Sequence, residues 1–270
     1  MTVGLIGLGL VGTAIAERVE SAGYELIAYD IDASRSRTAA VEDAACAPVV
    51  FLSLPHSTAV GEVLDRVEPV LQRGQIVVDT STGDPEEAIR FAARLASRGV
   101  AFIDAAIAGS SQQLRQADVN VLAGGEVQAV SAVCPILSTF AQRIFHIGPS
   151  GSGARMKLVS NLVLGLNRAV LAEGLAFAEA SGIAPSLALE VFKAGSTYSR
   201  VMDIKGDKML NAEYTPEARL SQHLKDVRLM LKQSPWLPLT ALHEQLLSKA
   251  EELGLGALDN SAIREVFRRE

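Results

Sequence analysis

Cysteine and tryptophan are scarce in this chain. Its 270 residues include two cysteines and one tryptophan, and aromatic residues make up 5% of the sequence. Cys46 and Cys134 form no C-x-x-C motif and the four histidines are scattered, so the sequence offers neither a disulfide framework nor a cluster of metal ligands. We therefore expect a protein without a structural metal that works in the reducing cytoplasm.

Long basic runs and long uncharged apolar runs are also missing. The 25 Lys and Arg residues are outnumbered by 31 Asp and Glu residues, and the net charge of −6 argues against nucleic acid as a partner. No basic residue precedes the apolar N-terminal stretch, as a signal peptide would require, and we expect no membrane span. The 49% of hydrophobic residues suffice for the core of one large or two ordinary soluble domains.

The segment Val3–Gly12 combines an apolar strand pattern with the glycine spacing G-x-G-x-x-G. Gly7 would permit the tight turn, Gly9 would let the backbone approach a diphosphate, and Gly12 would let the next helix lie close to the strand. The N-terminus of that helix would direct its free N–H groups at the anion. The pattern therefore predicts a dinucleotide site formed by Gly7, Leu8, Gly9, Leu10, Val11 and Gly12.

An acidic residue follows this turn at the expected distance. Asp30 ends a second predicted strand, 24–30, where a carboxylate binds the ribose hydroxyls of NAD and repels the additional phosphate of NADP. Two features leave alternatives open, because Arg35 and Arg37 could pair with a 2′-phosphate and Asp32 could be the ribose ligand. We favour NAD as the cofactor, with NADP possible.

Strand and helix patterns alternate over the first 150 residues. Further apolar strands are predicted at 48–55, 75–79, 99–104, 119–125 and 143–148. Helical periodicity occurs between several of them, at 60–71, 85–98 and 127–141. Such alternation with short connections is typical of the α/β class with a doubly wound parallel sheet, and it predicts a dinucleotide-binding domain over residues 1–150.

Beyond the glycine-rich break at 148–153 the strand patterns disappear. Helices are predicted at 154–181, 185–193, 216–233, 239–253 and 261–269, which makes residues 151–270 an all-helical second domain. The helix 154–181 is apolar on most of its faces, so it must be buried between domains or between subunits. We therefore expect self-association, as a homodimer or homotetramer.

Two polar residues stand four positions apart on this apolar helix. Lys157 and Asn161 project from one face, and two interpretations compete. In the first, Lys157 extends to solvent and Asn161 caps a neighbouring backbone group. In the second, the lysine, held by the amide, hydrogen-bonds an oxygen whose carbon exchanges hydride with a nicotinamide.

Several segments together resemble one family. They are Gly4–Gly12, Leu54-Pro55, Asp79–Thr82, Asp104–Gly125, Gly151-Ser152-Gly153 with Lys157 and Asn161, and Lys225-Asp226. In this order they resemble the β-hydroxyacid dehydrogenase family, which includes 3-hydroxyisobutyrate and tartronate semialdehyde enzymes and is related to 6-phosphogluconate dehydrogenase. The resemblance covers nearly the whole chain and implies a Rossmann domain followed by a helical domain.

The resemblance also implies roles for individual residues. Lys157 would be the general acid or base and Asn161 its partner at the substrate. Lys225 would lie near both nicotinamide and substrate. The residues lining the nicotinamide half of the cofactor would be Leu54, Pro55 and Thr82.

The substrate loop departs from the family pattern D-A-P-V-S-G-G. This chain has alanine at Ala108, where the family places a serine that helps to hold the substrate carboxylate. Ser110 or Ser111 could restore a hydroxyl nearby, and the backbone N–H groups of Gly109 and Ser110 are expected to remain available for an anion. A substrate subsite is therefore expected at Ala108, Gly109 and Ser110. Ser160, where the family commonly has asparagine, is interpreted as a neutral change.

Other polar residues carry weaker signals. Lys225 stands beside charged neighbours on what could be a solvated helix face. His56 and His223 have no recognisable orienting partner and are left out of the proposed chemistry. Tyr198 falls in a loop that could contact substrate, although an ordinary surface loop is favoured. The sequence thus predicts an NAD(P)-dependent oxidoreductase acting on a small β-hydroxy acid or semialdehyde. The alternatives are an imine reductase-like enzyme, which would generally lack Lys157, and a non-catalytic dinucleotide-binding protein.

Overall fold

The structure is a computed structural model that describes residues 1–268. This part of the chain divides into two compact units, one of residues 1–157 and one that starts at Leu158. The predicted domain limits, 1–150 and 151–270, stay a prediction, because the helix that begins at Ser152 belongs in part to each unit. Arg269, the last residue of the predicted helix 261–269, lies outside the described residues.

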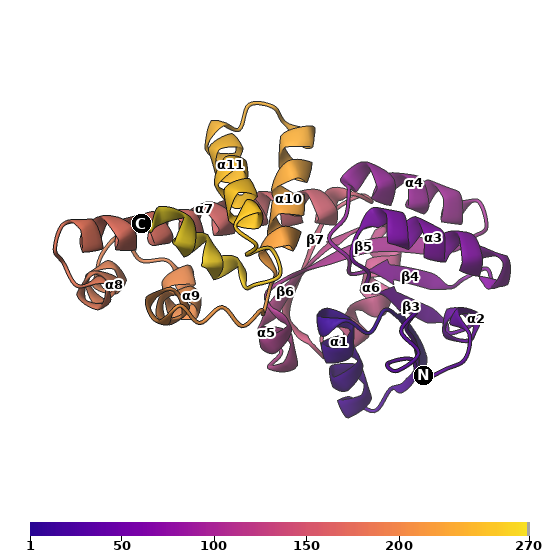
Figure 1. The fold of residues 1–270 in the computed structure, drawn as a ribbon. Coiled ribbons are helices and arrows are strands. Elements are labelled where there is room, and N and C mark those ends of the chain that lie inside the picture. The colour runs from indigo at the N-terminus through magenta and orange to yellow at the C-terminus, as the bar shows by residue number, and fades with distance from the viewer. Residues whose placement is uncertain (269–270) are drawn as a thin grey trace. The chain divides into compact units, whose positions relative to one another are not determined.

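The first unit is built on a seven-stranded sheet (Figure 1). Its strands are β1 (Thr2–Ile6), β2 (Glu25–Tyr29), β3 (Val49–Leu52), β4 (Ile76–Asp79), β5 (Ala101–Ala108), β6 (Val119–Gly124) and β7 (Ala141–Gly148). The order is β2-β1-β3-β4-β5-β6-β7, and all neighbours are parallel except β5 and β6. The doubly wound α/β fold is therefore confirmed, with one antiparallel pair that the sequence analysis did not predict. The connection 109–118 holds only a five-residue helix, too short to return the chain across the sheet.

Helices cover both faces of this sheet. They are α1 (Leu10–Ser21), α2 (Val41–Ala45), α3 (Ser57–Val67), the 3₁₀ helix η1 (Glu68–Val70), α4 (Pro85–Ala96), α5 (Ser111–Arg115) and α6 (Val127–Leu137). Apolar residues of α1, α5 and α6 pack on one face, and those of α2, α3 and α4 pack on the other. Because β1 lies between β2 and β3, the chain changes direction across the sheet there, and the carboxyl ends of β1 and β3 border the crevice in which such folds bind ligands.

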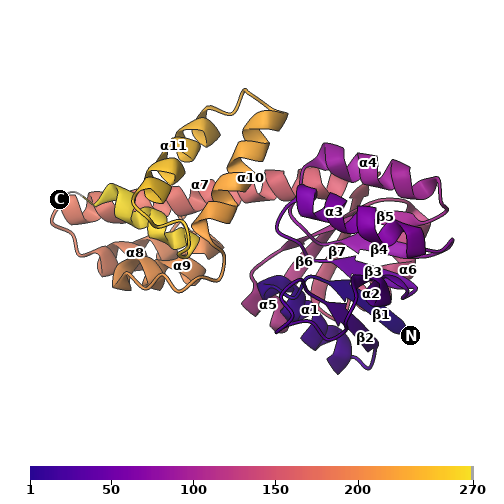
Figure 2. The ribbon, with the colours of Figure 1, turned by 45° about the vertical axis from the view of Figure 1, so that its right-hand side comes forward.

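The second unit consists of helices. They are the part of α7 (Ser152–Ala180) from Leu158 on, α8 (Pro185–Ala194), α9 (Arg200–Asn211), α10 (Leu220–Gln233), α11 (Pro238–Glu252) and the 3₁₀ helix η2 (Asn260–Phe267). Within it, α10 and α11 form a hairpin on one side of α7, and α8 and α9 lie on the other side (Figure 2). Buried apolar side chains of all these helices form one core. The sequence analysis predicted α7, α8, α10 and α11 within a few residues and missed α9.

Among residues 1–268, α7 is the one helix whose length and composition would also allow it to cross a membrane. A long helix at the centre of a helical domain meets the same two criteria, so this finding is weak evidence for a membrane span. Six apolar residues of α7 lie in the core of the second unit: Leu158, Ala169, Leu171, Ala172, Leu175 and Ala178.

Candidate functional site

The glycine turn after β1 has the geometry that the sequence predicts. Gly7 has a φ of +100°, and a Cβ there would lie 2.3 Å from the carbonyl oxygen of Ser53. A Cβ at Gly12 would lie 1.9 Å from the carbonyl oxygen of Gly7, so only glycine lets α1 approach the strand this closely. Gly9 differs, since a Cβ there would meet nothing within 4 Å and, as the N-cap of α1, it offers no side-chain cap. The open backbone at Gly9 and the uncapped helix N-terminus fit a diphosphate.

Asp30 lies against this turn. Its carboxylate accepts hydrogen bonds from the N–H of Leu8 at 2.6 Å and from the N–H of Asp32 at 2.8 Å. A carboxylate has about four acceptor positions, so Asp30 holds the glycine turn and still has capacity for ribose hydroxyls. The side chain of Asp32 instead accepts from Ser34 at 2.6 Å and 3.0 Å. These bonds lower the pKa of Asp32. Asp30 therefore has more unused acceptor capacity than Asp32, and its role as the ribose ligand stays a prediction.

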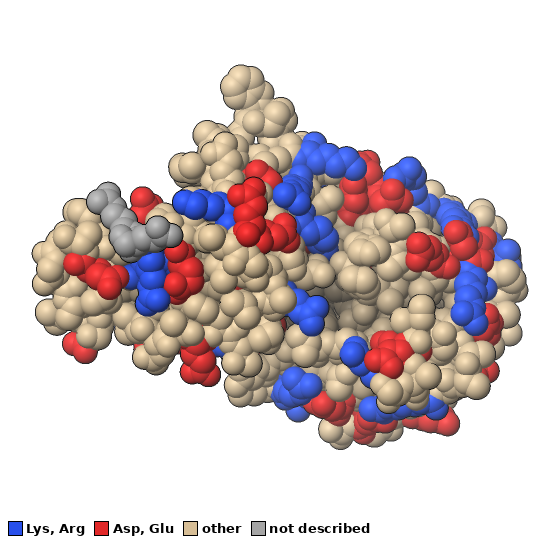
Figure 3. Space-filling view, viewed as in Figure 1, with Lys and Arg blue, Asp and Glu red and all other residues tan. Residues whose placement is uncertain are grey.

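The two arginines that could serve a 2′-phosphate both have acidic partners. Arg35 forms an ion pair with Asp32 at 3.1 Å, and Arg37 forms one with Glu20 at 2.6 Å. Figure 3 shows that Lys and Arg side chains also lie next to Asp and Glu side chains elsewhere on the visible face. These pairings favour NAD over NADP.

The expected nicotinamide-lining residues lie in loops at the carboxyl ends of β3 and β4. Leu54 and Pro55 follow β3, and the N–H of Leu54 donates to the hydroxyl of Ser81 at 2.9 Å. Ser81 in turn donates its N–H to Asp79, the last residue of β4, at 2.9 Å. The two loops are thus tied together beside Thr82, at the same edge of the sheet as the glycine turn.

The start of α7 is fixed to the sheet by a buried carboxylate that the sequence analysis did not single out. Asp104 of β5 is 3% exposed and accepts hydrogen bonds from the N–H groups of Gly151 and Ala154, each at 2.8 Å. Burial raises the pKa of Asp104, although these backbone bonds act in the opposite direction. A Cβ at Gly153 would lie 2.5 Å from the carbonyl oxygen of Asp104, so glycine is needed for this contact. The signal in the sequence was an acidic residue inside an apolar strand.

Lys157 stands one turn beyond this anchor and is 8% exposed. This burial excludes the interpretation in which Lys157 extends into solvent. Asn161 is 7% exposed and donates through Nδ2 to Oδ2 of Asp226 on α10 at 2.9 Å. Its amide thus bonds a side chain, whereas the first interpretation had it cap a backbone group. The ammonium of Lys225 lies 3.4 Å from the other oxygen of Asp226. Asp226 therefore joins Asn161 and Lys225, a role that the sequence analysis did not assign.

The loop after β5 uses its own polar groups differently from what the sequence analysis expected. Ser110 is the N-cap of α5, its N–H donates to Oε1 of Gln113 at 3.0 Å, and its hydroxyl accepts from the N–H of Gln113 at 3.2 Å. The expectation that the N–H of Ser110 remains available for an anion is therefore wrong, because the capping box of α5 takes it. Gly109 and Ala108 offer no side-chain donor to replace it.

A cluster of buried polar residues lies next to Asn161 in the second unit. A Cβ at Gly165 of α7 would lie 2.3 Å from Nε2 of His223 on α10 and 2.7 Å from Cε1 of His243 on α11. The centroids of the two imidazole rings are 5.2 Å apart. Arg168 of α7 is 2% exposed, and its burial lowers the pKa to about 10. Glycine at Gly165 thus sets the spacing of α7 and α10 one turn from Asn161.

His243 makes the stability of this unit depend on pH. Burial, together with the charge of Arg168, lowers the pKa of His243 from 6.5 to about 4. Below pH 6.5 the unfolded chain therefore binds a proton that the folded chain excludes, and we expect the free energy of unfolding to fall by about 3 kcal/mol between pH 6.5 and pH 4. Denaturant titrations over this range should show the loss, and His243→Gln should reduce it. A slope in His243→Gln equal to that of wild type would contradict the assignment.

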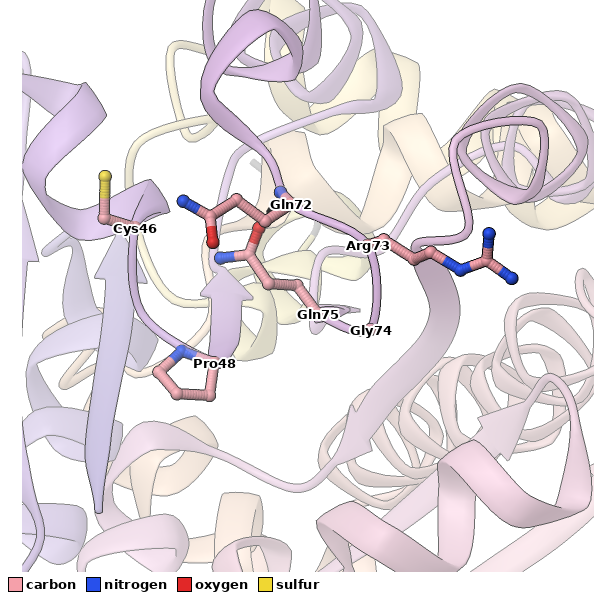
Figure 4. A pocket seen from close by; sticks show the side chains of 6 residues that line it. All are labelled: Cys46, Pro48, Gln72, Arg73, Gly74 and Gln75. Atoms are coloured by element: carbon pink, nitrogen blue, oxygen red, sulfur yellow. Dashed lines mark hydrogen bonds between the residues drawn. The ribbon is translucent and has the colours of Figure 1, made fainter.

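A surface hollow at the opposite edge of the sheet does not belong to the site. It is lined by Cys46, Pro48, Gln72, Arg73, Gly74 and Gln75 and lies before β3 and β4 (Figure 4). The amide of Gln75 is already used, because Nε2 donates to the carbonyl oxygens of Ala45 and Ala47 at 2.9 Å and 2.6 Å and Oε1 accepts from the N–H of Gln72. Within residues 1–268, no group of three or more potential ligands could hold a metal ion.

Comparisons with known proteins cover both parts of the chain. Residues 2–148 match the family model described as the NAD binding domain of 6-phosphogluconate dehydrogenase. Residues 151–267 match the model described as NAD-binding of NADP-dependent 3-hydroxyisobutyrate dehydrogenase. The first match covers the part of the chain that forms the sheet, and the second covers the part that forms α7 to η2.

Individual relatives are similar over almost their whole length. The chain is 28% identical to 2-(hydroxymethyl)glutarate dehydrogenase of Eubacterium barkeri, with 99% of this chain and 95% of the relative covered. It is 26% identical to 2-hydroxy-3-oxopropionate reductase of Escherichia coli, with 97% and 96% covered. The solved 3-hydroxyisobutyrate dehydrogenase of Mycobacterium tuberculosis, with L-serine, has the same fold, with a TM-score of 0.90 at 21% identity and 99% of each chain covered.

Proposed function

Because the chain belongs to the β-hydroxyacid dehydrogenase family of NAD(P)-dependent oxidoreductases, we propose that it exchanges hydride between NAD and a small β-hydroxy acid or semialdehyde. The observation that carries this proposal is the burial of Lys157, one turn from the point where Asp104 fixes α7 to the sheet. A lysine in this setting is held in place by the fold, as acid–base catalysis requires.

The cofactor is assigned to the first unit. The backbone of Gly7–Gly12 would bind the diphosphate, the carboxylate of Asp30 the ribose, and the loops containing Leu54, Pro55 and Thr82 the nicotinamide half. When bound, the nicotinamide accepts or supplies the hydride. The ion pairs of Arg35 and Arg37 support the preference for NAD.

Lys157 is assigned the proton transfer. During oxidation its neutral amine takes the hydroxyl proton of the substrate as hydride leaves the same carbon atom, and during reduction its ammonium returns a proton to the carbonyl oxygen. Asn161, held by Asp226, is assigned to orient that oxygen, and Lys225 to lie beside it. The end of β5 at Ala108, Gly109 and Ser110 is assigned to the acid group of the substrate.

A turnover screen tests the proposal. Small 3-hydroxy acids and the matching aldehydes are offered with NAD(H) and NADP(H), and reduction or oxidation of the nicotinamide is followed at 340 nm. We expect turnover of at least one acid or semialdehyde and a lower KM for NAD than for NADP. Cofactor binding without any turnover would favour a non-catalytic protein, and turnover of amines and imines alone would favour an imine reductase.

We also propose that the chain self-associates through α7. Five large apolar residues of this helix are at least 43% exposed within the single chain: Val159, Val163, Leu164, Val170 and Phe177. A second copy would remove this apolar area from water. Sedimentation velocity should give twice the mass of one chain or a higher even multiple.

We propose a location in the cytoplasm. The free thiols of Cys46 and Cys134 fit a reducing compartment, and fractionation of the source cells would test this proposal.

A further inference from the structure

One face of α7 has the residue spacing of a coiled-coil seam. Residues at alternating intervals of four and three positions lie along this face, and they are exposed or half-exposed in the single chain. We call these six residues the α7 seam: Val159, Val163, Leu166, Val170, Glu173 and Phe177. In a heptad they occupy positions a and d, which face a second helix in coiled coils. A different stripe of α7, with Leu158, Leu171 and Leu175, packs into the core of the second unit, so that unit uses one of two apolar faces.

The α7 seam forms a large apolar patch. Val170 is 67% exposed, Phe177 is 74% exposed, and Glu173 is the one charged member of the six. The other five leave roughly 400 Å² of apolar surface uncovered, about half of the area that each partner buries in a stable complex, and exposed flanking residues such as Leu164 add to it. A second copy fits this patch, because it offers the same residues and each copy covers the other in one symmetric contact.

The position of Glu173 decides how two such helices pair. In a parallel pair with equal register, each d position faces the same d position, so the two Glu173 carboxylates would meet inside the contact and repel each other. In an antiparallel pair centred on Arg168, each a position instead faces a d position of the other copy. The facing residues are then Val159 and Phe177, Val163 and Glu173, and Leu166 and Val170. Glu173 now lies one turn from Asn167 of the second copy, whose exposed amide can donate to the carboxylate.

We propose that two copies of this chain pair their α7 helices antiparallel along the α7 seam, with Val159 of each copy against Phe177 of the other. This inference rests on the proposed self-association and gives its surface, orientation and register. Asn161 and Arg168 occupy f positions of the same heptads, on the side of α7 that faces away from the seam. Pairing therefore leaves the bond between Asn161 and Asp226 in place.

Cysteine cross-linking tests the orientation and the register. Val159→Cys and Phe177→Cys are made separately in a Cys46→Ser, Cys134→Ala background, and both new thiols replace exposed side chains. Each variant is purified alone and, with different affinity tags, co-expressed with the other, and every sample is oxidised with copper phenanthroline. We expect a disulfide-linked dimer only in the co-expressed sample, because facing positions come within reach of a disulfide, whereas two copies of one position lie about 27 Å apart. The exposed control Lys249→Cys on α11 should cross-link with neither variant.

Sedimentation velocity of Val170→Glu gives an independent measurement. The new carboxylate would lie inside the contact, so the mass should fall at least twofold while far-UV circular dichroism keeps the helical signal of wild type. Cross-links in each single variant alone would overturn the antiparallel orientation. An oligomeric mass without any cross-link, or one that Val170→Glu leaves unchanged, would overturn the seam but not self-association, and a wild type with the mass of one chain would overturn both. None of these measurements requires turnover, so the hydride-transfer proposal is tested separately.

Discussion

Replacing Lys157 by alanine is expected to lower kcat/KM by about a hundredfold to ten-thousandfold, the range that a general acid–base group contributes. The variant keeps the glycine turn and Asp30, so its affinity for NAD should remain within about twofold of wild type. The measurement is steady-state turnover of the substrate identified by the screen, combined with NADH binding by fluorescence. The loss should appear in kcat, because the proton transfer belongs to the chemical step.

Two comparisons separate this role from a structural one. Lys157→Met keeps the apolar stem that α7 buries and removes only the charge, so it should be as inactive as the alanine variant while unfolding at the wild-type temperature. Lys249→Ala removes an exposed lysine of α11 and should leave activity unchanged. Full activity of Lys157→Met with a genuine substrate would refute the assignment.

Gly9→Ala is expected to abolish most cofactor binding without harming the fold. The backbone of Gly9 has a φ of −70°, which alanine adopts freely, and the added methyl group meets nothing within 4 Å. It would stand where the diphosphate must approach the backbone, and the loss of two charge-assisted hydrogen bonds costs about 3 kcal/mol, or about a hundredfold in Kd. Isothermal titration with NAD and a thermal melt of the same sample measure both properties.

Gly12→Ala is the matched contrast within the same turn. Its Cβ would lie 1.9 Å from a backbone oxygen that cannot move aside, so this variant should lose thermal stability as well as NAD affinity. If Gly9→Ala binds NAD like wild type, the diphosphate does not lie on this turn. If both variants melt at the wild-type temperature, the close packing of α1 against the turn is not needed for the fold.

Much of the first unit is predictable from the sequence because buried parallel strands and their helices have strong local patterns. The strand at 75–79 and the helix at 85–98 are found in this way. The helices α2 and α5, of five residues each, are too short to show a period. The antiparallel pairing of β5 and β6 depends on contacts across the sheet, and so the sequence alone could not show that Asn120 stands opposite Ala108.

In the second unit the missed elements involve buried charges. The helix α9 buries Lys205, whose ammonium lies 2.9 Å from the fully buried Asp259, so its apolar period is interrupted by a lysine. Asp226 was quoted as part of a motif, but its bond to Asn161 joins residues 65 positions apart on two helices. Such pairings become visible only when the helices pack. The choice between a solvated and a buried Lys157 is likewise decided by packing.

The two bonds that Asp30 makes within the protein link coenzyme choice to the integrity of the turn. A substitution of Asp30 that lets the site accept the 2′-phosphate of NADP also removes the acceptor for the N–H groups of Leu8 and Asp32. Such a substitution would therefore weaken the glycine turn while it changes the preference between NAD and NADP. The fold would therefore help to maintain the preference for NAD that we propose.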